Sequence, residues 1–129
     1  MVKSVKEPVS RVKDDDLSMQ DVISIITRAI EDKRGEQTLV LDLSGQVDYL
    51  DYLVLCCGNT DVHNRAIADA LIEALSAYDI IPDALDGYRF GDWILLDYGV
   101  LVVHVFLPAL RQFYRLEELW AAGLEVQLG

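Results

Sequence analysis

Hydrophobic positions recur at helical spacing in three stretches of the chain. The first begins after Ser18, whose spacing to Asp21 is typical of an N-terminal cap, and Gly35 is expected to end it. The second covers residues 61–78, where a one-sided apolar stripe predicts an amphipathic helix. The third covers residues 109–120. The pattern therefore predicts three helices, each with one face packed against the rest of the fold.

Short runs of aliphatic and β-branched residues lie between these helices. They predict strands over residues 38–43, 52–57, 93–97 and 100–107, with a further short strand near Leu85. The order of helix, two strands, helix, two strands and helix predicts a single small α/β domain with a mixed β-sheet flanked by helices. Residues 1–16 show no such periodicity. They are expected to form a flexible tail ahead of a domain that spans residues 17–129.

A hairpin is predicted between the last two strands. Tyr98 and Gly99 would form its two-residue turn, because glycine can adopt the positive φ that a tight turn needs. This register pairs Trp93 with His104, Leu95 with Val102 and Asp97 with Val100. Alternation along the strands then gives one wholly aliphatic face and one mixed face. Since Trp93, Asp97 and His104 share the mixed face, we expect a functional site on the sheet to use it.

The net charge of the chain limits the classes of molecule that it can bind. The 129 residues include 22 acidic and 11 basic side chains, for a formal net charge of -11. Such a surface repels phosphate backbones and anionic lipid, so direct or sequence-specific binding of nucleic acid is not expected, whereas a basic protein would be attracted. The adjacent Cys56 and Cys57 point to opposite faces of a strand and favour a reducing, cytoplasmic environment. No signal peptide and no membrane-spanning segment is predicted.

Catalytic and metal-binding patterns are weak. His63 and His104 lie on separate elements, and no cysteine or carboxylate stands at a zinc-ligand spacing from either. An Asp-x-Asp pair occurs only at residues 14–16, in the tail. The Gly58-Asn59-Thr60-Asp61 turn is interpreted chiefly as a helix cap rather than a phosphate site. Trp93 beside His104 can equally be an aromatic pair that closes one end of a core. The sequence therefore predicts no metal, no cofactor and no catalytic residue.

Several segments, taken in order, resemble the Iojap family, the ribosomal silencing factors called RsfS. They are Asp51-Tyr52, the Gly58 turn, His63, residues 66–69, residues 93–99, residues 103–106, and a C-terminal signature of Arg111, Tyr114, Leu116-Glu117 and Leu119-Trp120. The resemblance spans nearly all of residues 17–120. The chain departs from the family at residues 58–63, where relatives usually have Gly-Thr-Ser before an arginine-histidine pair.

The resemblance implies a nucleotidyltransferase-like core that lacks the catalytic carboxylates, and a task that is not enzymatic. Members of this family bind the large ribosomal subunit through ribosomal protein fourteen, a basic protein at the subunit interface, and block joining of the small subunit. This represses translation. Proteins of this type also form homodimers. Two alternatives remain from the residues alone: a metal-dependent nucleotidyltransferase, or a dimeric adaptor module.

The site residues expected on this basis fall into two groups. The partner-binding group is centred on Trp93, with Asp97, Tyr98 and His104 beside it and Asp92 and Asp86 at its rim. The second group is a dimer or C-terminal contact, and it comprises Tyr114, Leu119 and Trp120.

Overall fold

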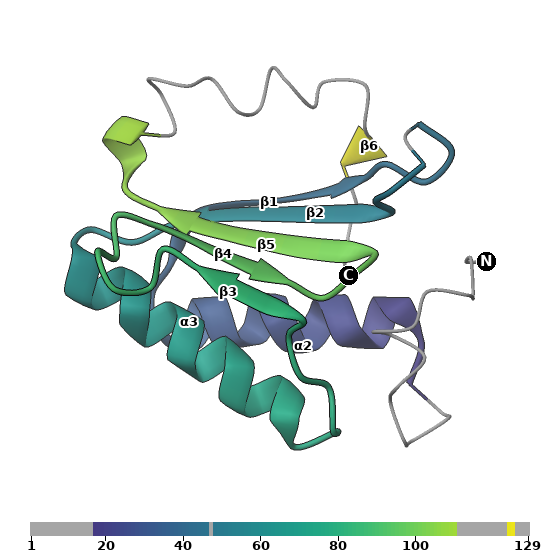
Figure 1. Ribbon diagram of the computed structural model, residues 1–129, viewed down its shortest axis with the longest axis horizontal. Coiled ribbons are helices and arrows are strands. Elements are labelled where there is room, and N and C mark those ends of the chain that lie inside the picture. The colour runs from purple at the N-terminus through teal and green to yellow at the C-terminus, as the bar shows by residue number, and fades with distance from the viewer. Residues whose placement is uncertain (1–16, 47, 111–123, 126–129) are drawn as a thin grey trace.

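The structure, a computed structural model, describes residues 17–46, 48–110 and 124–125. Its elements are α2 (Met19–Asp32), β1 (Glu36–Asp42), β2 (Tyr52–Cys57), α3 (Asp61–Ser76), β3 (Ala84–Asp86), β4 (Trp93–Asp97), β5 (Leu101–Phe106) and β6 (Leu124–Glu125). The six strands form one sheet of order β3-β4-β5-β2-β1-β6. Helices α2 and α3 lie side by side against one face of it (Figure 1). The predicted α/β class, with a mixed sheet and flanking helices, is confirmed.

Two other predictions fall largely outside the described residues. The expected tail, residues 1–16, is one of them. The other is the helix over residues 109–120: residues 108–110 are helical, and residues 111–120 are not described.

Helix α2 has a complete cap at each end. At its start, the Ser18 hydroxyl accepts the backbone N–H of Asp21 at 3.1 Å, and the Asp21 carboxylate accepts the backbone N–H of Ser18 at 3.0 Å. At its end, Arg34 takes the left-handed conformation with φ 62°, and the N–H of Gly35 donates to the Ile30 carbonyl at 2.8 Å. Gly35 therefore follows the left-handed residue, and its missing side chain leaves room for Ile30.

Helix α3 begins as predicted and ends earlier. Thr60 is its N-cap, with a hydroxyl that accepts the backbone N–H of His63 at 3.0 Å. The prediction extended the helix to residue 78, but it ends at Ser76. Asp79 adopts φ 65° and lets Ile80 donate back to the Leu75 carbonyl at 3.1 Å, so the chain turns well before Pro82.

The strand pairing of β4 with β5 corrects the predicted register. The turn is formed by Gly99 and Val100, because Tyr98 N–H donates to the Leu101 carbonyl at 2.8 Å and Gly99 supplies φ 90° at the first central position. The observed pairs are Trp93 with Phe106, Leu95 with His104 and Asp97 with Val102. The shift is two residues, so each side chain keeps its predicted face. Strand β2 pairs in parallel with β5 and antiparallel with β1.

The sheet separates two apolar clusters. One lies under the helices and includes Ile26, Val54, Cys56 and Leu71. The other lies on the opposite face and includes Leu53, Leu55, Cys57 and Phe106, with Trp93 and Val102 packed at its edge. Cys56 and Cys57 thus point to opposite faces, as predicted. The mixed face of the hairpin is the edge of this second cluster.

Candidate functional site

The centre of the mixed face is an aromatic cluster of Trp93, His104 and Phe106. The Trp93 indole Nε1–H donates to His104 Nδ1 at 3.0 Å, and the two ring centroids lie 6.0 Å apart. Phe106 is fully buried beside them, with its ring centroid 5.8 Å from that of Trp93. Because Trp93 and His104 sit diagonally rather than directly opposite, the indole can reach the imidazole nitrogen. Trp93 is half-buried and is held in one orientation.

The hydrogen bond also defines the state of His104. Since Nδ1 accepts the indole proton, the imidazole is the neutral tautomer with its own proton on Nε2. Burial lowers the pKa of His104 to about 4, from an ordinary value of 6.5. At neutral pH the centre of the mixed face is therefore uncharged, and it is suited to an aromatic contact rather than to proton transfer.

A hollow of about 350 Å³ lies beside this cluster. It is lined by Tyr49, Leu50, Leu53, Asp97, Gly99, Val102 and His104. Parallel pairing of β2 with β5 brings the loop before β2 against the hairpin. Tyr49 is 65% exposed at this hollow. Sequence reasoning did not select Tyr49 or Leu50 as site residues, although a tyrosine in a polar loop is a signal that could have pointed to them.

Carboxylates lie around the aromatic centre. Asp97 shares its face and is half-buried, with Oδ1 accepting the Gly99 N–H at 2.8 Å. This bond holds the carboxylate over the hairpin turn. Asp86 and Asp92 are exposed, on β3 and just before β4 respectively. The structure thus brings Trp93, Asp97 and His104 together on one face, with two further aspartates on neighbouring segments.

Tyr98 does not belong to this surface, and its assignment is corrected. It is 2% exposed and lies in the cluster beneath the helices. Its position has the same parity as Ile94 and Leu96, so strand alternation itself places it on the aliphatic side. Among the described residues its hydroxyl has no hydrogen-bond partner, and burial raises its pKa.

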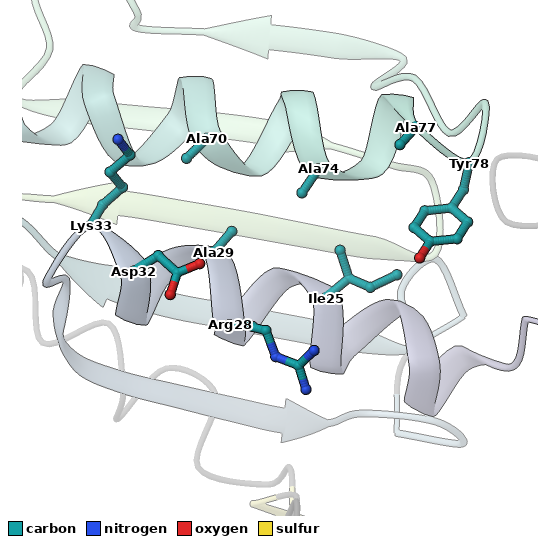
Figure 2. A pocket seen from close by; sticks show the side chains of 9 residues that line it. All are labelled: Ile25, Arg28, Ala29, Asp32, Lys33, Ala70, Ala74, Ala77 and Tyr78. Atoms are coloured by element: carbon teal, nitrogen blue, oxygen red, sulfur yellow. The ribbon is translucent and has the colours of Figure 1, made fainter.

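A second hollow, of about 530 Å³, runs between α2 and α3 (Figure 2). Its floor is formed largely by short side chains, among them Ala29, Ala70 and Ala74. The Tyr78 ring lies at one end and Lys33 at the other, as Figure 2 shows. The short alanine side chains leave this space between the two helices unfilled. It carries no cluster of aromatic and acidic groups, so the hairpin face is the stronger candidate.

The remaining site predictions are placed as follows. Tyr114, Leu119 and Trp120 lie outside the described residues. Within residues 17–46, 48–110 and 124–125, no three His, Cys, Asp or Glu side chains gather as they would around a metal ion. Across those same ranges, no helix has the length and apolar character needed to span a bilayer.

Several known proteins similar to this chain are named as ribosomal factors. Residues 16–128 match the family RsfS, described as ribosomal silencing factor during starvation. The ribosomal silencing factor RsfS of Halalkalibacterium halodurans is 34% identical over 112 residues, which cover 87% of this chain and 96% of that protein. A crystal structure of a Chromobacterium violaceum protein superimposes with a TM-score of 0.78 at 27% identity, covering 88% of this chain and 93% of that one.

A more distant relative is mouse mitochondrial assembly of ribosomal large subunit protein 1. It is 26% identical over 101 residues, which cover 76% of this chain and 44% of the mouse protein. The bacterial relative is named for a regulatory role, and none of these names indicates a catalytic activity. The resemblance seen in the sequence is confirmed: the chain belongs to the RsfS family of ribosomal silencing factors.

Proposed function

We propose that this protein, in the cytoplasm, binds the large ribosomal subunit and blocks joining of the small subunit, which represses translation. The contact would be made with a basic ribosomal protein at the subunit interface, ribosomal protein fourteen. Membership of the RsfS family supports the ribosome as target. The mouse relative, which is named for assembly of the ribosomal large subunit, supports the large subunit in particular.

The observation that carries the proposed docking surface is the hydrogen bond from Trp93 to His104. A half-buried indole held by a neutral imidazole is a rigid aromatic group, and it loses little conformational entropy when a partner covers it. The hollow beside it, lined by Asp97 and Tyr49 among others, can receive a side chain of the partner. Trp93 would therefore be the central anchor, with His104 as its positioning residue.

Charge would bring the partners together. The net charge of -11 favours encounter with a positively charged protein and disfavours bare RNA. Asp86, Asp92 and Asp97 would set the encounter rate and its salt dependence more than the final affinity. The proposed mechanism is a steric block and needs no catalytic step. The bound domain would occupy space that the small subunit requires.

The test is binding to purified large subunits by co-sedimentation, followed by reassociation with small subunits. Trp93→Ala should cost about 2–4 kcal/mol of binding free energy, which weakens the Kd by about 30-fold to almost a thousandfold. Tyr78→Ala is the matched control, since it removes a partly exposed aromatic from the helix side and should leave binding unchanged. A folded Trp93→Ala variant that binds like wild type would remove the anchor from the proposal.

A metal-dependent nucleotidyltransferase would have to bind nucleoside triphosphates with magnesium. Isothermal titration of the protein with each triphosphate and magnesium should give no binding heat if the protein acts as a steric block. Saturable binding followed by turnover would favour the enzyme.

A homodimer is proposed as well, through the C-terminal residues Tyr114, Leu119 and Trp120. This contact stays a prediction from the sequence. Sedimentation velocity of Trp120→Ala should show a monomer where wild type shows a dimer, and an unchanged wild-type dimer would exclude Trp120 from the interface.

A further inference from the structure

The loop between β3 and β4 is tightly closed. The Gly91 N–H donates to the Gly87 carbonyl at 2.9 Å, and both glycines have positive φ, 78° at Gly87 and 77° at Gly91. A Cβ on Gly87 would overlap the Trp93 carbonyl oxygen, so the loop lies directly against the start of β4. We call residues 87–91 the Phe90 loop.

Three side chains of α3 hold this loop. Asn64, fully buried, donates from Nδ2 to the Gly91 carbonyl at 2.8 Å. Arg65 donates from Nη1 to the Arg89 carbonyl at 3.1 Å and pairs with Asp61 at 2.8 Å. The Asp69 carboxylate accepts the hydroxyl of Tyr88, at 2.8 Å from Oδ1 and 3.0 Å from Oδ2. The carbonyl groups of the residues before and after Phe90 therefore accept hydrogen bonds from side chains of α3.

Phe90 itself is 79% exposed, more than any other large hydrophobic side chain in the described ranges. A single exposed aromatic on a mobile loop would need no explanation. Here four hydrogen bonds within or beneath the loop, with the Tyr88 hydroxyl shared between both oxygens of Asp69 and counted once, order the segment that presents it. A preordered aromatic gains affinity for a partner because little entropy is lost on binding.

The charges near the loop indicate what Phe90 would contact. Asp86 and Asp92, both exposed, stand on either side of the closed loop in the sequence, and Arg89 is the one basic residue within it. An exposed aromatic ring on an acidic protein attracts a lysine or arginine side chain, which can lie over the face of the ring. The net charge of -11 favours a basic protein over RNA as the source of that side chain.

We propose that Phe90 is a second anchor, which receives a lysine or arginine side chain of the same basic ribosomal protein that covers Trp93. This inference rests on the proposed function. It extends the docking surface from the mixed face of the hairpin to the Phe90 loop. This loop lies at the end of the sheet where β4 begins, and it comes just before Trp93 in the chain.

Three substitutions separate a cation–π contact from simple apolar burial. In co-sedimentation with purified large subunits, Phe90→Ala and Phe90→Leu should each weaken the Kd by about three- to tenfold, whereas Phe90→Tyr should keep wild-type affinity. Ile81→Ala is the matched control, because Ile81 is 53% exposed in the connection that follows α3, and it should bind like wild type. Both side chains are exposed, so the melting temperatures of all four variants should stay unchanged.

The outcomes are distinct. Loss of binding by Trp93→Ala with unchanged binding by Phe90→Ala or Phe90→Leu would overturn this inference and leave the proposed function standing. No binding by the wild-type chain would overturn both. Binding to large-subunit RNA stripped of protein, if Phe90→Ala abolished it, would replace the basic protein with RNA and overturn the inference in its present form.

Discussion

The imidazole of His63, in the first turn of α3, connects that helix to the end of α2. Its Nδ1 accepts the Asn59 N–H at 2.9 Å, and its Nε2 lies 2.6 Å from the Lys33 carbonyl oxygen. Because Nδ1 acts as an acceptor, the ring proton is on Nε2 and is donated to Lys33. His63 thus makes hydrogen bonds with two backbone groups: the N–H of Asn59 in the turn before α3, and the carbonyl of Lys33, the C-cap residue of α2.

Removing this side chain should loosen the helix pair. His63→Ala deletes both hydrogen bonds, and we expect the free energy of unfolding to fall by about 1–2 kcal/mol. Urea denaturation followed by circular dichroism measures this difference. Val62→Ala, at a neighbouring position that is 65% exposed, is the control and should change stability by less than about 0.5 kcal/mol. Equal stabilities of the two variants would contradict a bridging role for His63.

His104 should make stability depend on pH. Burial lowers its pKa to about 4 in the folded protein, against the ordinary value of 6.5. Between these values the unfolded chain binds a proton that the folded chain does not, so stability is complete above about pH 6.5 and falls as the pH drops towards 4. The loss from this group should be about 2–3 kcal/mol.

His104→Asn isolates this contribution, because an amide oxygen can accept the Trp93 N–H and does not titrate in this range. Denaturation midpoints of both proteins between pH 4 and 7 should show a shallower decline for the variant. Parallel curves would mean that His104 is not the group responsible.

Gly58 should tolerate no side chain. A Cβ at this position would overlap Asn64 Oδ1 and lie 3.1 Å from His63 Nδ1. Gly58→Ala should therefore cost about 1–3 kcal/mol of folding free energy. In a double-mutant cycle, Asn64→Ala should recover about 1 kcal/mol of this cost, since it removes the overlapping oxygen. Strictly additive effects, measured by denaturation, would show that the two positions do not meet.

The buried hydroxyl of Tyr98 should destabilise the folded protein. At 2% exposure it has no hydrogen-bond partner in the part of the chain that the structure describes, so Tyr98→Phe should raise the free energy of unfolding by about 0.5–1.5 kcal/mol. Because the ring lies beneath the helices, the same variant should bind large subunits with wild-type affinity. A loss of binding without a loss of stability would return Tyr98 to the docking surface.

The sequence predicted correctly those elements that depend on interactions between residues close together in the chain. The Ser18 cap and the Thr60 cap depend on residues three positions apart, and both form as the pattern predicts. The limits of β2 and β4 also agree with the prediction, because each is a dense apolar run. The left-handed ends of both helices were missed, since Arg34 and Asp79 occupy positions where glycine is the usual signal.

Alternation along the strands by itself determined which side chains of the hairpin share a face, because the period of two survives a register shift of two residues. The tertiary structure alone decided the rest of the candidate site. The turn at Gly99 and Val100 sets the diagonal contact of Trp93 with His104, and parallel pairing of β2 with β5 brings Tyr49 to the hollow beside His104. These contacts join residues that are distant in the chain, and their geometry depends on hydrogen bonds between strands rather than on the residues that surround each one in the sequence.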